Sequence, residues 1–109
     1  MRQFEAIKLM QGATSVLNLD LTEFDFQGGD VVLTIRKKGG EIVREWSFDE
    51  PAVHALVFED EFTATLENGR YGYEYDVMWH IDGERFAQCT PSPVEVYRTV
   101  GGYPYGADD

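Results

Sequence analysis

The longest regular pattern in the chain is an alternation of apolar and polar residues that ends at a tight turn, Asp82-Gly83. Strand side chains alternate with a period of two, so every second residue of this stretch lies on the same face. The residues of the apolar face are Tyr71, Tyr73, Tyr75, Val77 and Trp79. The other face is mostly polar. We therefore expect one buried and one wetted face, as in an antiparallel sheet packed on a single core.

Shorter stretches with the composition of strands occur along the rest of the chain, separated by turn signals. The clearest runs from Ser15 to Leu21, with Leu17, Leu19 and Leu21 predicted to point inward. The full set of predicted strands is 4–10, 15–21, 31–36, 42–48, 52–58, 62–66, 71–80, 84–90 and 94–97. Paired glycines at 28–29 and 39–40 and the Asp82-Gly83 pair predict the connecting loops and hairpin turns.

These features predict an all-β fold. No stretch shows a sustained helical period with caps, and short strands with glycine turns are typical of a sandwich. We expect an antiparallel, immunoglobulin-like β-sandwich of about seven to nine strands. Leu66, Gly69 and Tyr71 are predicted to form a tyrosine corner, a structural feature of such sandwiches.

Length and composition indicate one domain. The chain has 109 residues, a size common for an independently folding unit. We assign residues 1–98 to the sandwich and residues 99–109, which are rich in Gly, Pro and Asp, to a flexible C-terminal tail. Three tyrosines near this end, Tyr97, Tyr103 and Tyr105, are candidates for partner binding, because tyrosine outside a core favours interfaces.

The charge of the chain limits its partners. Twenty acidic and nine basic residues give a formal net charge of −11. Binding to nucleic acid or to an anionic membrane depends on clusters of Lys and Arg. The only basic run, Arg36-Lys37-Lys38, is short and is interpreted as the solvated end of a strand. We expect neither nucleic acid nor membrane as a partner.

Cysteine usage and the N-terminus bear on the compartment. The single cysteine, Cys89, cannot form an intramolecular disulfide, which is typical of a reducing compartment. The first ten residues include Arg2, Glu5 and Lys8 and lack the apolar core of a signal peptide. We expect synthesis in the cytoplasm.

One catalytic arrangement was weighed. Cys89, His80 and either Asp76 or Asp82 have the residue types of a thiol-based triad. No recognisable nucleophile motif surrounds Cys89, and a lone small cysteine in a β domain is more often a buried spacer. We therefore expect no catalytic residue and no enzymatic activity.

Metal and cofactor sites were weighed on the acidic clusters and the histidines. One cluster comprises Asp20, Glu23, Asp25 and Asp30, and another comprises residues 59–61. Neither has the Asp-x-Asp-x-Asp-Gly spacing of a calcium loop. His54 and His80 lack cysteine partners at zinc-site spacing, and no glycine-rich phosphate loop is present. We expect no metal and no cofactor.

The two tryptophans offer an alternative function. An exposed ring of Trp46 or Trp79, or of Tyr73 or Tyr97, would suit a carbohydrate-binding or adhesion module. Both tryptophans lie on the predicted apolar faces, which favours core packing instead.

Four stretches together resemble a known family. They are Gln11-Gly12 before the leucine strand, residues 30–37 (DVVLTIRK), residues 62–77 (FTATLENGRYGYEYDV) and residues 81–84 (IDGE). Over residues 5 to 98 the chain resembles the immunoglobulin-like N-terminal domain of phage baseplate upper proteins and related small tail proteins of phages and prophages. It stops after the sandwich, without their long extension, and is expected to be a free-standing module or a shortened relative.

The resemblance implies a structural function. Such domains carry no catalytic residues and join other tail components through edges and loops. We expect a non-enzymatic structural or adaptor protein of a phage or prophage particle, in the tail or baseplate, assembled into the virion. Its expected partners are other phage structural proteins, and self-association stays open.

Overall fold

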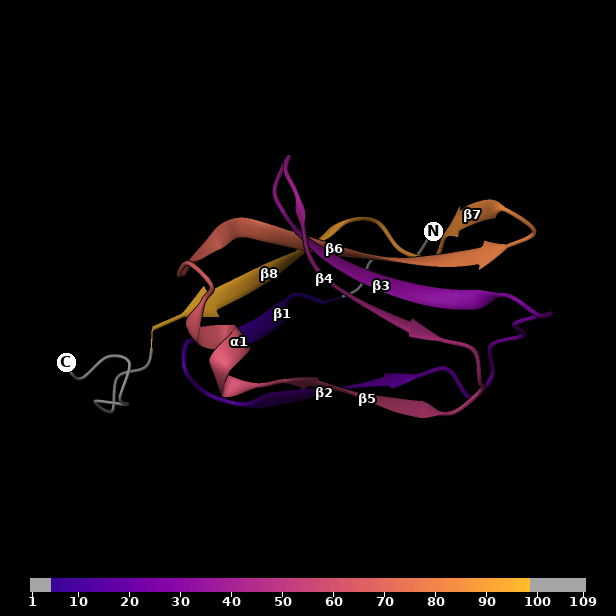
Figure 1. The fold of residues 1–109 in the computed structure, drawn as a ribbon, viewed down its shortest axis with the longest axis horizontal. Coiled ribbons are helices and arrows are strands. Elements are labelled where there is room, and N and C mark those ends of the chain that lie inside the picture. The colour runs from indigo at the N-terminus through magenta and orange to yellow at the C-terminus, as the bar shows by residue number, and fades with distance from the viewer. Residues whose placement is uncertain (1–4, 99–109) are drawn as a thin grey trace.

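The computed structural model describes residues 5–98. These residues form eight strands and one short helix (Figure 1). The strands are β1 (Ile7–Met10), β2 (Ser15–Asp20), β3 (Asp30–Lys37), β4 (Ile42–Phe48), β5 (Val53–Phe58), β6 (Gly69–Ile81), β7 (Glu84–Ala87) and β8 (Ser92–Tyr97), and the helix is α1 (Asp60–Ala64).

The strands lie in two layers. The larger sheet has six strands in the order β1-β8-β6-β3-β4, with β7 paired to β6, and the smaller sheet consists of β2 and β5 alone. Figure 1 shows β2 and β5 as a separate layer below the larger sheet. The predicted all-β sandwich is confirmed, with a strand number inside the predicted range.

One pairing departs from the antiparallel prediction. β1 and β8 pair in parallel, with Ile7 opposite Val94 and Leu9 opposite Val96. This register places the buried residues of both strands on the same face. A parallel pair needs a long connection, and here the rest of the domain supplies it.

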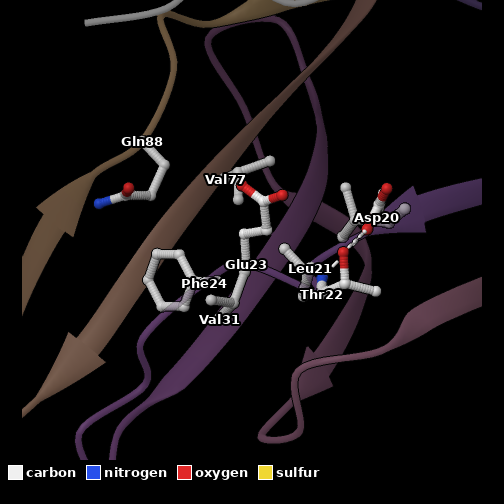
Figure 2. Close-up of a pocket in the computed structure, with 9 residues that line it drawn as sticks. Asp20, Leu21, Thr22, Glu23, Phe24, Val31, Val77 and Gln88 are labelled. Atoms are coloured by element: carbon white, nitrogen blue, oxygen red, sulfur yellow. Dashed lines mark hydrogen bonds between the residues drawn. The ribbon is translucent and has the colours of Figure 1, made fainter.

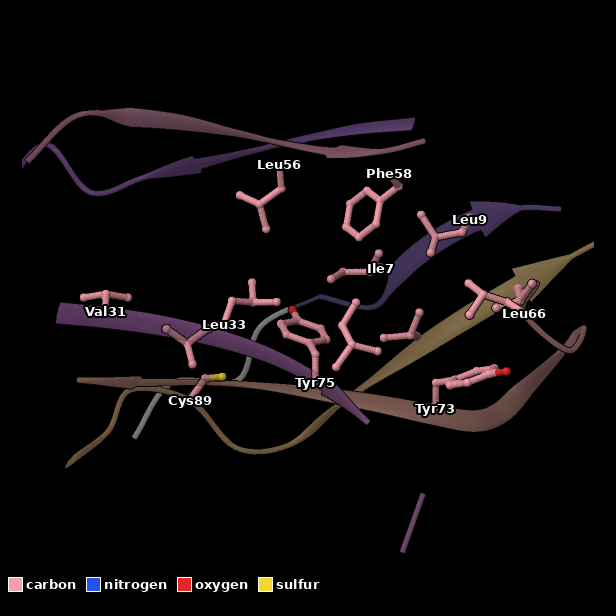
Figure 3. Packing of buried hydrophobic residues seen from close by; sticks show 14 of the residues in the cluster. Ile7, Leu9, Val31, Leu33, Leu56, Phe58, Leu66, Tyr73, Tyr75 and Cys89 are labelled. Carbon is pink, nitrogen blue, oxygen red and sulfur yellow. The ribbon is translucent and has the colours of Figure 1, made fainter. Parts of the chain in front are cut away.

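The core fills the space between the layers (Figure 3). Leu56 and Phe58 point from β5 toward the larger sheet, where Leu33 and Tyr75 face them. Leu17 and Leu19 of β2 pack against the same cluster, and Leu21 is buried just after the strand, as predicted. The small sheet is therefore held to the large one by side-chain packing.

The hairpin between β6 and β7 has the predicted tight turn. Ile81 pairs with Glu84, which leaves Asp82 and Gly83 as a two-residue loop. Both loop residues have positive φ, 53° and 77°, as a type I′ turn requires.

The prediction of a strand at 62–66 is wrong, because residues 60–64 form helix α1. Asp60 and Glu61 lie in its first turn, where acidic side chains are favoured. Thr63 is fully buried and donates a hydrogen bond to the Ala13 carbonyl at 2.9 Å. Phe62 and Leu66 are four residues apart, a spacing that keeps two side chains on one face of either a strand or a helix.

The predicted tyrosine corner is misplaced by two residues. Tyr71 is 74% exposed, whereas Tyr73 is 4% exposed and its hydroxyl accepts a hydrogen bond from the Glu67 amide at 2.9 Å. The pairing of β6 with β8 shifts register between Gly69 and Tyr73, so the alternation does not continue back to Tyr71. Leu66 is buried in the core as expected, and Tyr73 takes the role assigned to Tyr71.

We expect Tyr73→Phe to lower the free energy of unfolding by about 1 kcal/mol, because the Glu67 amide loses its hydrogen-bond partner. The matched control, Tyr71→Phe, removes an exposed hydroxyl and should change stability by less than about 0.5 kcal/mol. Urea unfolding of both variants measures the difference. Equal effects would contradict the placement of the corner at Tyr73.

Candidate interaction surface

The outer face of the small sheet carries apolar side chains without cover among the described residues. In β2 the exposed positions are Val16, Asn18 and Asp20, and in β5 they are Val53, Ala55 and Val57. We call these six residues the valine face. Val16 lies directly opposite Val57, and Val53 lies opposite Asp20. Val16 is 58% exposed, Val53 is 56% exposed and Val57 is 40% exposed.

Strand alternation produces this face. Because Leu56 and Phe58 point into the core, the residues between and before them must point to solvent. The exposed face of an antiparallel sheet ordinarily carries polar residues, whereas here three of the outward positions carry valine. The signal was available in the sequence, as valines at outward positions of two alternating strands, and sequence reasoning did not use it.

Other exposed apolar side chains lie on the larger sheet. Ile42 of β4 is 50% exposed, Phe86 of β7 is 43% exposed, and Met10 of β1 is 42% exposed. With Tyr71 they are distributed over four different strands. The valine face is distinct because its members are direct cross-strand neighbours.

An open pocket of about 480 Å³ lies where β2 ends beside the larger sheet (Figure 2). It is lined by Leu19, Asp20, Leu21, Thr22, Glu23, Phe24, Val31, Val77 and Gln88. The Asp20 carboxylate accepts hydrogen bonds from the Thr22 hydroxyl at 2.7 Å and the Thr22 amide at 3.0 Å, which lower the pKa of Asp20. Asp20 thus fixes the turn that forms the pocket wall.

The structure does not bring the candidate triad together. Cys89 is 1% exposed and belongs to the core cluster drawn in Figure 3. Asp76 and His80 lie on the opposite, outer face of β6, where His80 is in register with Asp30 and Arg85. Burial raises the pKa of the Cys89 thiol, which disfavours the reactive thiolate. The geometry supports the spacer interpretation of Cys89.

The outer face of the larger sheet holds a group of acidic side chains. Asp76 lies opposite Thr34, whose hydroxyl donates a hydrogen bond to the Glu45 carboxylate at 3.1 Å. Burial raises the pKa of Asp76, with Arg36 opposing the shift and the charges of Glu74 and Glu45 adding to it. The ionised carboxylate of Asp76 is therefore held in an unfavourable environment.

The acidic clusters weighed for calcium do not form a ligand group. Within residues 5–98, no three His, Cys, Asp or Glu side chains are placed to hold a metal ion together. In the second cluster, Glu59 instead binds the Arg44 guanidinium at 2.6 Å, which lowers the pKa of Glu59.

Of the described helices, none is long and apolar enough to cross a membrane.

Both tryptophans pack against the core, as the sequence favours. Trp46 makes an edge contact with Phe58 at 5.1 Å and lies under the Arg44 guanidinium at 4.7 Å. Trp79 donates its indole N–H to the Phe26 carbonyl at 3.1 Å. Tyr73 is buried and Tyr97 half-buried. None of the four rings proposed for glycan stacking is fully exposed, so the contacts do not favour that alternative.

Of the tyrosines proposed for partner binding, Tyr97 alone falls within the described residues. It lies at the end of β8, opposite Met10 of β1, and its hydroxyl donates a hydrogen bond to the Glu95 carboxylate. This bond raises the pKa of Tyr97. Tyr103, Tyr105 and the rest of the predicted tail, residues 99–109, lie outside the described part of the chain.

Comparisons with known proteins find similarity only among solved structures. No protein-family model matches the chain. No curated protein matches it. Among solved structures, the chain is similar to the N-terminal domain of ORF48 of phage TP901-1. The two have a TM-score of 0.44 and 14% sequence identity, over 87% of this chain and 85% of the other. At this identity and TM-score the likeness is a similarity only, and no role is assigned to the chain from it.

We expect Asp76→Asn to raise the free energy of unfolding at pH 7. The pKa of Asp76 is higher in the folded protein than its ordinary value of 3.8, so the folded state binds the proton more tightly. Stability from this group is present at low pH and is lost as the pH rises through the raised pKa.

Urea unfolding between pH 3 and pH 8 measures this effect of Asp76 on stability. The asparagine variant should lose less stability than the wild type as the pH rises. The control is Asp20→Asn, where Thr22 holds the pKa down and no gain at pH 7 is expected. A loss of stability at pH 7 in Asp76→Asn would contradict the assignment.

Proposed function

We propose that the chain is a non-enzymatic structural or adaptor protein of a phage or prophage particle, in its tail or baseplate, and that it acts by protein–protein binding. It is made in the bacterial cytoplasm and becomes part of the virion. The assignment to a phage is supported by the sequence motifs at 11–12, 30–37, 62–77 and 81–84, which resemble baseplate upper protein domains.

The observation that carries the binding function is the exposure of apolar side chains on regular strands. Val16 and Val53 are more than half exposed although each lies in a paired strand. Contiguous apolar side chains on a soluble domain mark interaction sites. Strands hold such side chains in fixed positions, so binding needs little reordering of the domain.

The net charge of −11 supports a protein as the partner. Such a charge repels nucleic acid and anionic lipid, and it steers the chain toward basic protein surfaces. The partners are accordingly other structural proteins of the particle.

Mass spectrometry of density-purified particles from a prophage-induced culture of the source organism tests this function. We expect the chain at a fixed ratio to the tail proteins, and that ratio reports the symmetry of its position. A control culture from which the gene has been deleted should yield particles that lack the chain and show an assembly or attachment defect. Complete, infectious particles without the chain would contradict the proposal.

A further inference from the structure

The exposed edges of the larger sheet carry features that prevent unwanted strand pairing. β4 has a register shift against β3 and carries Arg44. β1 and β7 have only four residues each and include Lys8 and Arg85 respectively. Irregular pairing, short length and basic side chains are the usual means of keeping an edge strand from binding another chain.

The small sheet has none of these features within its strands. β2 and β5 are six residues long, pair with each other without a register shift, and contain no Lys, Arg or Pro. Each has one strand neighbour in the sheet, and within residues 5–98 no strand pairs with its other edge. A regular, valine-bearing sheet of this kind is an aggregation hazard unless another protein covers it.

The charge around this sheet is of one sign. Residues 11–35 contain four acidic residues and residues 45–69 contain seven, and neither range contains Lys or Arg. These ranges include β2, β5, α1 and the loops that join them. Two of these carboxylates have a basic partner: Glu59 binds Arg44 of β4 at 2.6 Å, and Glu67 lies 3.7 Å from the Lys37 ammonium. The valine face therefore lies in an acidic part of the molecule.

This charge distribution indicates which kind of protein surface can cover the valine face. A second copy of the chain carries the same formal net charge of −11 and would bring an equally acidic surface against this face. Like charges placed across an interface disfavour that pairing, whereas a basic surface is attracted to the same carboxylates.

We propose that the valine face binds a basic surface of another protein of the particle. Apolar side chains of that partner cover Val16, Val53 and Val57, and its Lys or Arg side chains lie against the surrounding carboxylates, including those of Asp20 and Glu50. The inference rests on the proposed function, and it adds which face of the sandwich binds and what chemistry the partner presents.

The test compares incorporation of variants into purified particles. Val57→Glu and Val16→Glu place a charge on the valine face, and Ile42→Glu is the matched control on the larger sheet, at a residue of similar exposure. We expect both valine variants to be incorporated at least about tenfold less than wild type, and the isoleucine variant to be incorporated normally. Thermal unfolding followed by circular dichroism establishes that each variant is folded, and Val57→Thr replaces any glutamate variant that is not.

A second pair of variants tests the charge of the partner. Glu50→Lys reverses an exposed charge three residues before Val53 of the valine face, and Glu84→Lys reverses one on β7 of the larger sheet. A basic partner should lose more affinity for the first variant than for the second, and release of the wild-type chain from particles should increase with salt. Equal incorporation of the two lysine variants would overturn the basic character of the partner.

The remaining outcomes separate this inference from the proposed function. If wild type and both valine variants enter particles at the same ratio, the chain is a particle protein that binds through another face, and the inference alone fails. If wild type does not enter particles, both fail. If the free chain forms a dimer that Val57→Glu dissociates, the occupant is a second copy, and the basic partner is overturned.

Discussion

The structure depends on how Phe58 joins two sheets that share no ladder hydrogen bonds. This side chain is 1% exposed and makes an edge contact with Trp46 of β4 and a stacked contact with Phe62 at 6.4 Å. Arg44 covers both of those partner rings and binds Glu59, the residue that follows Phe58. These contacts fix the small sheet at the C-terminal end of β5. The outer face of the small sheet therefore has a defined position relative to the rest of the domain.

A sandwich in which one layer has two strands exposes more of that layer than a balanced sandwich does. In β5 the side chains of Leu56 and Phe58 are buried in the core, and the alternation of the strand places Val53 and Val57 on the outer face. The larger sheet instead places charged and polar side chains such as Glu45, Glu74 and Asp76 on its outer face. The two outer faces therefore differ in character, and the small sheet is the one suited to close apolar contact.

Much of this architecture could be predicted from the sequence, because alternation and glycine turns are local signals. The leucine strand, the Asp82-Gly83 hairpin and the final strand at 94–97 were all predicted correctly. Features set by tertiary register were not. The shift before Tyr73 moves the tyrosine corner. A register shift between Ile35 and Arg36 accompanies the exposure of the apolar Ile42 at the start of β4. The valine face was missed although its valines stand at outward positions of two predicted strands, because alternation alone does not show whether another layer covers the outer face of a sheet.

Hydrogen–deuterium exchange of the chain, free in solution and within purified particles, tests the central claim most directly. Binding through the valine face predicts that peptides from β2 and β5 become protected in the particle by about tenfold or more, while peptides from β7 and the turn at 38–41 exchange at the same rate in both states. Protection gained only on the larger sheet, or on neither sheet, would contradict the account.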